Sequence, residues 1–316
     1  MAKRDPLEDR LVVLIGGSGF LGTHVAQALL ERGARLRIAS RHPEKAFRLR
    51  PLANLGQIQF VRCNVTDRAS VAAAMQDAHA AAYLVGAFKG DLKALQADGA
   101  GLAAEAAARE GADAFAYVSA TVADTESPSA YARTKALGER AVLDAFARAT
   151  ILRPSVLFGE RDNFINMFAG LISMMPVLPV FGADAKLQPL WVNDAAEALA
   201  AALADPATHG GNTYELAGPQ VVTMGELNRR IAEAQGRKRH FVEMPDAISG
   251  IFASLPGTPM SRDQWRMLQA GSVASGELPG IEKLGIQPKP LDLFLDKWMV
   301  RYRRHGRFST RPEAAR

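Results

Sequence analysis

The amino-acid sequence predicts an α/β protein with a doubly wound parallel sheet, followed by a smaller α/β unit that is discontinuous along the chain. Three observations lead to this prediction. Six short apolar segments alternate with segments of helical periodicity in the first half of the chain, which is the pattern of a parallel sheet covered by helices on both faces. The rhythm ends near residue 155, where prolines and glycines become frequent. A chain of 316 residues that is 48% hydrophobic can also bury a large core.

The predicted strands are the six apolar segments of the first half, residues 11–15, 36–40, 58–62, 81–85, 114–119 and 149–154. Leu21, Val25 and Leu29 recur at intervals of four residues, which predicts a helix after the first strand. The alanine-rich segment 94–109 predicts a second helix.

The second half of the chain has one clear helix signal. Thr223 is followed three residues later by Glu226, which is the spacing of a capping box. Met224, Leu227 and Ile231 then lie on one face, and we expect a helix of the smaller unit there.

The segment IGGSGFLG, residues 15–22, lies between the first predicted strand and the first predicted helix. Gly16, Gly19 and Gly22 have the spacing in which one glycine makes the turn, one lets the backbone approach a pyrophosphate and one packs helix on strand. The phosphates would lie on the N–H groups at the positive end of the helix. We therefore expect a Rossmann-type dinucleotide-binding loop, and a purely structural turn is the alternative. The expected cofactor contacts are Gly16, Ser18, Gly19, Phe20, Leu21 and Gly22.

The end of the second strand favours one form of the cofactor. The segment RIASRHPEK, residues 37–45, places Ser40 and Arg41 where an acidic residue would bind an unphosphorylated ribose, with Lys45 further on. A guanidinium group and a hydroxyl group suit a 2′-phosphate. NADP(H) is therefore favoured over NAD(H), and the competing interpretation is an ordinary solvated loop arginine at position 41.

Tyr131 and Lys135 are four residues apart and share one face of a predicted helix. Lys135 can lower the pKa of the phenol and bind the nicotinamide ribose. The phenol is then a general acid or base near neutral pH. Ser119 ends the fifth strand and Thr121 lies two residues further on, and both are candidates for a hydroxyl that holds the substrate oxygen. If Ser119 points into the site, it completes the triad; if the alternation of side chains along the strand turns it away, Thr121 must serve or the position is empty.

Four segments occur in a familiar order: GGSGFLGTHVAQALLERG, YARTK, ILRPSVLFG and QPLWVNDAAEAL. With them, the chain resembles the extended and atypical short-chain dehydrogenase/reductase superfamily (NAD(P)-dependent epimerase/dehydratase-like) over nearly its whole length. The longer segments SPSAYARTKALGE, ILRPSVLFGERDNFIN and QPLWVNDAAEALAAAL look most like bacterial relatives of the nucleotide-binding accessory subunit of respiratory complex I (NADH:ubiquinone oxidoreductase).

The resemblance implies further site residues. Asn64 and Val65, after the third strand, would contact the adenine. Leu84, Val85 and Gly86, at the end of the fourth strand, would line the ribose. Pro154 and Ser155, after the sixth strand, would flank the nicotinamide. The resemblance also places Ala120 at the catalytic hydroxyl position of sugar-nucleotide epimerases, so that Ser119 or Thr121 must supply the hydroxyl or the position is empty. Asp194 resembles an acid that begins a helix of the second domain, and we expect it to be an N-cap.

The expected domains are a NAD(P)-binding Rossmann domain at residues 1–160, a smaller C-terminal domain mostly within residues 161–300 with segments that return to the Rossmann core, and a basic tail at residues 301–316. Two functions follow. One is a protein that holds NADPH in a structural or regulatory role linked to complex I or quinone metabolism. The other is an active NADP-dependent reductase or epimerase/dehydratase that uses Tyr131 and Lys135.

Charge and composition limit the partners. The net charge is +5, of which +6 falls in residues 297–316, so the rest of the chain is close to −1. This tail could approach an anionic membrane surface or an acidic partner such as complex I, or it is a solvated terminus. A nucleic acid is not expected as a partner, because no basic stripe with interleaved aromatic residues occurs elsewhere.

A single cysteine, Cys63, fits a reducing compartment. We expect no secretion signal, no transmembrane helix and a cytoplasmic location, with a peripheral position on the inner face of the respiratory membrane as a variant. The histidines lack metal-ligand spacing, so no metal site is predicted. Residues 164–191 and 244–260 are rich in Met, Phe and Leu, and only Lys186 is basic there. They suit an apolar or quinone-like ligand, or ordinary core packing.

Overall fold

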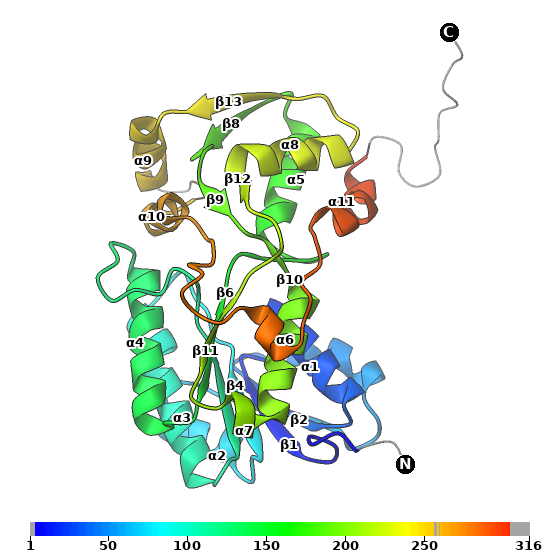
Figure 1. Ribbon diagram of the computed structural model, residues 1–316, viewed down its shortest axis with the longest axis vertical. Coiled ribbons are helices and arrows are strands. Elements are labelled where there is room, and N and C mark those ends of the chain that lie inside the picture. The colour runs from blue at the N-terminus through cyan, green and yellow to red at the C-terminus, as the bar shows by residue number, and fades with distance from the viewer. Residues whose placement is uncertain (1–3, 256–257, 259, 304–316) are drawn as a thin grey trace.

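The computed structural model of the protein describes residues 4–255, 258 and 260–303. A seven-stranded sheet with helices on both sides forms one end of the molecule, and a second group of helices and short strands forms the other (Figure 1). The strand order is β11-β6-β5-β4-β1-β2-β3, and all of its pairings are parallel. The predicted doubly wound α/β class is confirmed.

Six of the seven strands of this sheet agree closely with the predicted segments. They are β1 (Leu11–Ile15), β2 (Arg35–Ser40), β3 (Ile58–Arg62), β4 (Ala80–Tyr83), β5 (Ala114–Val118), β6 (Thr150–Pro154) and β11 (Thr213–Leu216). The seventh strand, β11, was not predicted. It is only four residues long and contains Glu215, whose buried carboxylate accepts hydrogen bonds from the backbone N–H and the hydroxyl of Ser275 at 2.8 and 3.0 Å. The acid is tolerated in the sheet because a distant loop satisfies it.

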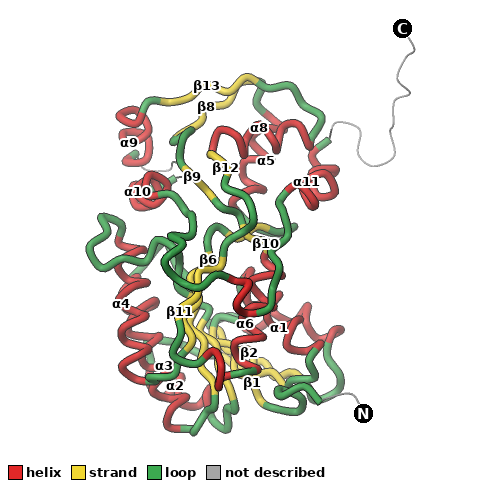
Figure 2. Tube along the Cα trace, viewed as in Figure 1, coloured by secondary structure: helices red, strands yellow, loops and turns green. Residues whose placement is uncertain are grey.

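Two layers of helices cover the sheet, and both are visible as coils on either side of the strands in Figure 2. One layer contains α1 (Phe20–Glu31) and α6 (Val192–Ala204), with η1 (Pro43–Leu52), α7 (Pro206–His209) and η3 (Ile281–Leu284) nearby; the other contains α2 (Arg68–Met75), η2 (Ala94–Asp98), α3 (Gly99–Arg109) and α4 (Ala130–Ala145).

Alternation along β1 explains why both layers are needed. Val12 and Leu14 point into the α1 and α6 layer, whereas Val13 and Ile15 point into the α3 and α4 layer. A strand whose two faces are both apolar is stable only when both are covered. The predicted apolar face of the first helix is confirmed, because Val25 and Leu29 are fully buried in the first of these layers.

The predicted helix at 94–109 forms, but its first part is not α-helical. Residues 94–98 make the π-helical turn η2, and the α-helix begins at Gly99. The hydroxyl groups of two buried tyrosines, Tyr83 and Tyr117, donate to the carbonyl oxygens of Leu95 and Gln96 in this turn. These bonds from the sheet accompany the local widening of the helix.

The second group of elements packs around its own apolar core. It contains β7 (Leu157–Phe158), β10 (Leu190–Trp191), β8 (Val177–Phe181), β9 (Lys186–Leu187), β12 (Val222–Thr223), β13 (His240–Met244), α5 (Phe164–Met174), α8 (Met224–Ala234), α9 (Asp246–Ser254), α10 (Arg262–Ala270), α11 (Asp292–Met299) and η4 (Val300–Tyr302). Ile165, Ile172 and Leu178 are buried in this core, so much of the apolar segment 164–191 serves packing. Met174 and Val177 remain exposed, at 74% and 46%.

Two expected helix caps differ from the structure. Thr223 caps α8 by accepting from the N–H of Glu226 at 3.1 Å, but the Glu226 carboxylate pairs with Arg230 instead of returning to the cap, so the capping box is incomplete. Asp194 is not an N-cap, because α6 already begins at Val192. Its buried carboxylate accepts from the backbone N–H of Lys289 at 2.7 Å and so ties the C-terminal segment to α6. The contact between Asp194 and Lys289 joins residues far apart in the chain and has no local signature in the sequence.

Two further features are absent from the described residues. Across residues 4–255, 258 and 260–303, no helix has the length and apolar character required to cross a membrane. Nor do His, Cys, Asp and Glu side chains in that part of the chain gather into a group that could hold a metal ion. Residues 304–316, most of the predicted basic tail, lie outside the described residues.

Candidate nucleotide-binding and catalytic site

The site lies where the strand order reverses, between the carboxyl ends of β1 and β4. Strands β2 and β3 continue the sheet on one side of β1, and β4, β5 and β6 continue it on the other. Loops that leave neighbouring strands in opposite directions open a crevice at such a point, and ligands of doubly wound sheets bind there. The glycine-rich segment after β1 and the segment 84–86 after β4 therefore meet at this edge.

The glycine-rich loop has the geometry of a phosphate-binding turn. Gly16 has φ +83°, a left-handed conformation that favours glycine, and a Cβ there would lie 3.2 Å from the backbone of Leu84. Gly19 precedes the first residue of α1, Phe20, and no side chain caps this end of the helix. The first N–H groups of a helix have no intrahelical partner, so those of Phe20, Leu21 and Gly22 are available to an anion at this end.

The third glycine allows the helix to pack closely on the turn. A Cβ at Gly22 would lie 2.6 Å from the Cα of Gly17 and 2.8 Å from the carbonyl oxygen of Gly16. Only glycine fits at that separation. Gly17 was not among the predicted site residues, although it directly follows Gly16, and Ser18 is half-buried beside it.

The end of β2 lies beside this loop, because the N–H of Gly16 donates to the carbonyl oxygen of Ala39 at 2.8 Å. Ser40 Oγ is buried, and among the described residues it has no hydrogen-bond partner. Arg41 is exposed. A second guanidinium group, missed by the sequence analysis, approaches the same region: Arg48 of η1 donates to Thr23 Oγ1 at 3.3 Å. The loop end thus has a hydroxyl in need of a partner and two nearby cations.

The residues expected around adenine and ribose are spread along the same edge. Asn64 follows β3, and its side-chain oxygen accepts from the N–H and the hydroxyl of Thr66 at 3.2 and 3.0 Å, which makes it part of a local turn. Val65 is buried behind that turn. Leu84 and Val85 are half-buried, and Gly86 is exposed with open space where a Cβ would be.

Lys135 is the central basic residue of the site. It lies in α4 and is only 2% exposed. Its Nζ donates to the carbonyl oxygens of Val85 at 3.1 Å and Val118 at 2.7 Å, and so joins the ends of β4 and β5. Burial lowers the pKa of its ammonium group from 10.5 to about 7, and the nearby Glu139 carboxylate opposes this shift. Glu139 itself is held by Arg153 of β6 through two hydrogen bonds of 2.8 and 2.6 Å.

Tyr131 lies one turn before Lys135. Its ring stacks on Phe88, with centroids 4.8 Å apart, and the Lys135 Nζ lies 5.9 Å from its ring centroid. The ring is partly accessible, yet its surroundings are dense enough for burial to raise the pKa of the phenol to about 12. The lysine therefore does not lower the phenol pKa in this arrangement, in contrast to the chemistry expected from the spacing of the pair alone.

The two candidate hydroxyl groups have different surroundings. Ser119, directly after β5, is 2% exposed, and its Oγ has no hydrogen-bond partner among the described residues. Thr121 is half-buried, and its Oγ1 lies 3.3 Å from Ser272 Oγ, within hydrogen-bond distance. An unsatisfied buried hydroxyl is destabilising unless a ligand or water completes it. Ser119 Oγ is therefore the candidate hydroxyl group whose missing hydrogen bond a ligand could supply.

Pro154 ends β6 and Ser155 follows it, but the Ser155 side chain has a structural partner. Its Oγ donates to the carbonyl oxygen of Gln188 at 2.5 Å, and the Gln188 amide in turn donates to the carbonyl oxygen of Gly218 at 2.7 Å. This chain of bonds connects β6 to the loops that lead into the second group of elements.

Helix α4, which carries Tyr131 and Lys135, is capped from a distant part of the chain. Asp263 of α10 accepts from the backbone N–H groups of Ala130 at 2.7 Å and Tyr131 at 3.1 Å, and from Ser129 Oγ at 3.1 Å. A carboxylate at a helix N-terminus is favourable because it satisfies free N–H groups and complements the helix dipole. The sequence analysis missed Asp263, since it lies more than a hundred residues from its partners.

Comparisons with known proteins agree with this geometry. Residues 10–270 match the family described as RmlD substrate binding domain. The mitochondrial NADH dehydrogenase (ubiquinone) 1 alpha subcomplex subunit 9 of Arabidopsis thaliana is 28% identical over 96% of this chain and 80% of its own. A ceramide reductase of Caulobacter vibrioides is 29% identical over 79% of this chain and 80% of its own.

Solved structures share the fold. The triphenylmethane reductase of Citrobacter sp. superposes with a TM-score of 0.75 at 20% identity and covers 91% of this chain and 99% of its own. The glycine-rich loop at the switch point, the Tyr131 and Lys135 helix and the family match over most of the chain lead to one conclusion. The chain belongs to the RmlD substrate binding domain family, within the extended and atypical short-chain dehydrogenase/reductase superfamily.

Proposed function

We propose that this protein binds NADP(H) and retains it in a structural or regulatory role, in association with respiratory complex I or with quinone metabolism. The observation that carries the proposal is the state of Lys135: its amine is buried and held by the carbonyl oxygens of Val85 and Val118, at the edge where a nicotinamide ribose would lie. The glycine-rich loop supplies the pyrophosphate position.

The preference for a 2′-phosphate rests on the end of β2. Ser40 Oγ is buried and in need of a partner, Arg41 is exposed, and Arg48 approaches the first turn of α1. Guanidinium groups bind phosphate in a planar fork, and an uncharged ribose would leave their charge unused. NADP(H) is therefore the proposed form, and NAD(H) is the competing one.

The state of the Tyr131 phenol supports retention over a reaction that begins with proton removal by Tyr131. With a pKa of about 12, Tyr131 is protonated at neutral pH and cannot act as a base there. Lys135, with a pKa of about 7, is only partly cationic at that pH and provides little activation. The Arabidopsis relative is a complex I subunit, which supports a respiratory partner for this chain and a peripheral position on the inner face of the respiratory membrane.

A second candidate function is an NADP-dependent reductase or epimerase/dehydratase. Ser119 Oγ favours it, since a buried hydroxyl without a partner at the end of β5 could donate to a substrate carbonyl. When bound, the cofactor supplies hydride. Tyr131, protonated at neutral pH, would hold the proton for the substrate oxygen, and Ser119 would orient that oxygen. The similarity to a ceramide reductase points in the same direction, and an apolar or quinone-like substrate suits the exposed Phe88 beside Tyr131.

One experiment separates the two functions. The protein is purified, its nucleotide is released and identified, and turnover is measured over a panel of carbonyl and quinone compounds. NADPH that stays bound and unoxidised supports the retention role. Rapid turnover that Tyr131→Phe abolishes would establish the enzyme instead. Recovery of NADH alone would refute the cofactor assignment.

A pair of variants tests the phosphate contact. Arg41→Asp is expected to weaken NADPH binding by about tenfold or more and to leave NADH binding nearly unchanged. Arg35→Asp, at the opposite end of the same strand, is the matched control and should change neither affinity. Equal losses of NADPH and NADH affinity in Arg41→Asp would contradict the assignment.

Co-purification with complex I from native membranes tests the proposed partner. The absence of co-purification at low ionic strength would count against that partner.

A further inference from the structure

Helices α9 and α10 pack side by side in the second group of elements, and a pocket of about 520 Å³ lies between them (Figure 1). We call it the α9–α10 pocket. Small side chains and the apolar Ile251 and Leu255 form its α9 wall, and Arg262, Trp265 and Arg266 are on its α10 wall. Its volume falls in the range of small-molecule sites, about 300–1,000 Å³.

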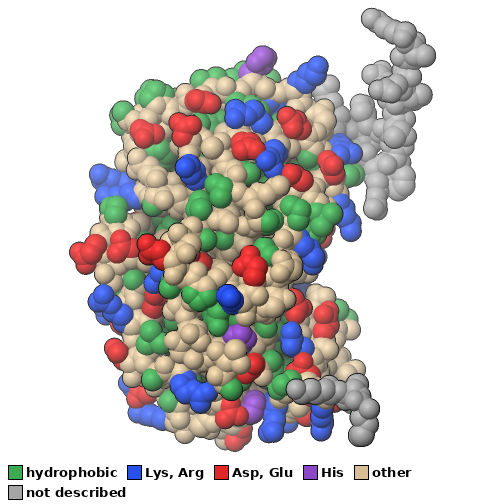
Figure 3. Space-filling model, viewed as in Figure 1, with side chains coloured by type: hydrophobic (Ala, Val, Ile, Leu, Met, Phe, Trp, Pro, Cys, Tyr) green, Lys and Arg blue, Asp and Glu red, His purple; other side chains and the backbone are tan. Residues whose placement is uncertain are grey.

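The α9 wall is an apolar surface that faces solvent. Ile251 and Leu255 are 66% and 54% exposed. The opposite face of α9 is anchored in the protein, because Phe252 stacks on Phe181 of β8 with ring centroids 4.5 Å apart. Figure 3 shows hydrophobic side chains over α9 at the upper left, with a basic group just below them beside α10. Packing of α9 against its own core therefore leaves this outer apolar face uncovered.

The α10 wall is polar. Arg262, Trp265 and Arg266 are three and four residues apart and so share one face of the helix. Arg262 is exposed and makes no hydrogen bond or ion pair with a described residue. Arg266 is half-buried and donates to the carbonyl oxygen of Pro128 at 2.9 Å. Asp263, the acid beside Arg262, accepts from the N-terminus of α4 and does not pair with Arg262.

Trp265 supplies a buried hydrogen-bond donor to the same wall. Its side chain is 5% exposed, and a Cβ at Gly250 would lie 3.7 Å from its indole Nε1. Gly250 and Trp265 both line the pocket, so this N–H lies at the pocket wall. Within residues 4–255, 258 and 260–303, the N–H donates to no acceptor. Because a buried indole N–H ordinarily has a partner, an oxygen atom of a ligand would complete it here.

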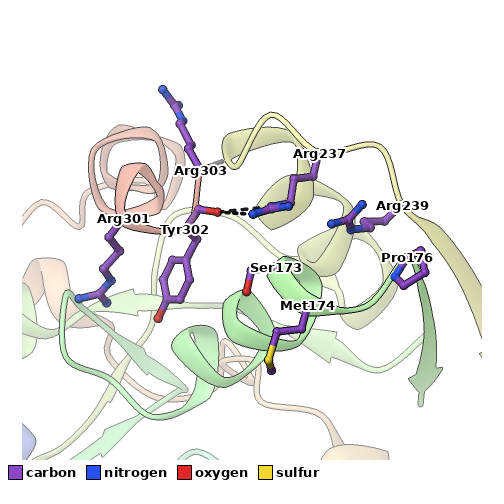
Figure 4. Close-up of a pocket in the computed structure, with 8 residues that line it drawn as sticks. All are labelled: Ser173, Met174, Pro176, Arg237, Arg239, Arg301, Tyr302 and Arg303. Atoms are coloured by element: carbon purple, nitrogen blue, oxygen red, sulfur yellow. Dashed lines mark hydrogen bonds between the residues drawn. The ribbon is translucent and has the colours of Figure 1, made fainter. Parts of the chain in front are cut away.

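A larger hollow of about 610 Å³, lined by arginines, lies elsewhere in the same group of elements (Figure 4). Its guanidinium groups have partners within the chain. Arg237 donates to the carbonyl oxygen of Tyr302 at 2.9 Å, and Arg301 donates to that of Glu160 at 2.6 Å and to the side-chain oxygen of Asn166. These structural contacts explain the positions of the arginines, whereas the donors of the α9–α10 pocket have no such explanation.

We propose that the α9–α10 pocket binds a single-chain anionic amphiphile, a molecule with one apolar chain and a carboxylate head group. The chain would lie along Ile251 and Leu255 and remove their exposed side chains from water. The carboxylate would accept from the guanidinium group of Arg262 and from the indole N–H of Trp265. The charge of Arg262 favours an anion over a neutral head group, and the apolar wall favours a chain over a free anion.

This site goes beyond the proposed function, because none of its residues belongs to the glycine-rich loop or to the pair Tyr131 and Lys135. Helix α10 nevertheless joins the pocket to α4. Asp263 caps α4, and Arg266 contacts Pro128, the residue before the N-cap of that helix. A bound amphiphile would therefore contact the same helix that holds the N-terminus of α4.

Isothermal titration calorimetry of the full-length protein with three soluble probes tests the proposal. Dodecanoate, kept below its micelle concentration, is expected to bind. Dodecanol carries the chain without the charge and acetate carries the charge without the chain, so each should bind at least about tenfold more weakly. Arg262→Gln should weaken dodecanoate binding by about tenfold and leave dodecanol binding unchanged. Ile251→Asp puts a carboxylate on the apolar wall and should weaken the binding of both.

Arg229→Gln is the matched control, because Arg229 is an exposed arginine of α8 that also makes no hydrogen bond with a described residue. This variant should bind dodecanoate like the wild type. Vesicles of phosphatidylcholine with phosphatidylglycerol test the competing occupant, a membrane surface. Binding to these vesicles without binding to dodecanoate would assign the apolar face to a membrane and overturn the proposal.

Two other results would also overturn it: dodecanol binding as tightly as dodecanoate, and both Arg262→Gln and Ile251→Asp binding dodecanoate as tightly as the wild type. Thermal unfolding and NADPH affinity, measured in parallel, verify that the variants are folded. If Ile251→Asp fails to fold, Arg262→Gln decides, since its side chain has no structural partner among the described residues. A protein that binds dodecanoate but not NADPH would support this site and refute the proposed function.

Discussion

Replacing Lys135 by methionine should change how the free energy of unfolding depends on pH, in the absence of nucleotide. Methionine has a similar length but no charge. In the folded chain, burial lowers the pKa of Lys135 to about 7, whereas in the unfolded chain it is 10.5. Between these values only the unfolded chain carries the proton. The unfolded state therefore binds more protons, and the stability contributed by this residue rises with pH through that interval.

The size of the effect follows from the two pKa values. One pH unit in this interval corresponds to 1.36 kcal/mol. From about pH 7, where the folded lysine is half-protonated, to about pH 9.5, the wild type should gain about 3 kcal/mol relative to Lys135→Met. The variant also leaves the carbonyl oxygens of Val85 and Val118 without the amine, at about 1–3 kcal/mol each. That loss changes little with pH, so the slope isolates the buried charge.

Urea unfolding of both proteins at several pH values measures this difference. Titrating groups that do not interact with Lys135 are common to the two chains and cancel in the comparison. We expect the free energy of unfolding of Lys135→Met, relative to that of the wild type, to be highest at neutral pH and to decrease as the pH rises. Parallel pH dependences of the two proteins would refute it, because they would mean that Lys135 titrates near its ordinary value in the folded chain.

Three further substitutions test the scaffold of the site. Asp263→Asn weakens the cap of α4 and is expected to lower the free energy of unfolding by about 1–2 kcal/mol. If the protein is an enzyme, this substitution should reduce turnover more than nucleotide affinity. Unchanged thermal stability would argue against the cap. Gly22→Ala places a Cβ 2.6 Å from Gly17 Cα and should destabilise the fold by about 1–3 kcal/mol. It should also weaken NADPH binding in a titration. Unchanged binding would show that the glycine-rich loop can shift to accommodate the methyl group. Arg153→Met leaves the buried Glu139 carboxylate unpaired, with an expected loss of about 3–5 kcal/mol in chemical denaturation, and a loss below 1 kcal/mol would contradict the buried-pair interpretation.

The sheet and the nucleotide loop were predictable because their signals are local. A strand such as β1 is apolar on both faces, and its residues alternate between two helix layers. The spacing of Gly16, Gly19 and Gly22 reflects steric requirements within a single turn. The capping serine or threonine of a helix also acts over three residues, so Thr223 was assigned correctly even though the partner of Glu226 was not.

Residues that act across long sequence separations could not be predicted in this way. Asp263 reaches α4, Asp194 reaches Lys289, and Ser155 reaches Gln188, and none of these pairs leaves a periodic pattern in the sequence. Strand β11 was missed for the same reason, since the acid in it is acceptable only because Ser275 satisfies it.

The sequence by itself determined the class of fold, the glycine-rich turn after β1 and the pairing of Tyr131 with Lys135 on one helix, because each depends on spacing within a few residues. Only the tertiary structure decided the chemical state of that pair: Lys135 is enclosed by the ends of two strands, and its pKa falls because burial disfavours its charge. Tertiary packing also gathered Arg237, Arg239 and the segment 301–303 around one hollow. Spacing along the chain encodes geometry at short range, whereas burial and charge density depend on which distant segments come together.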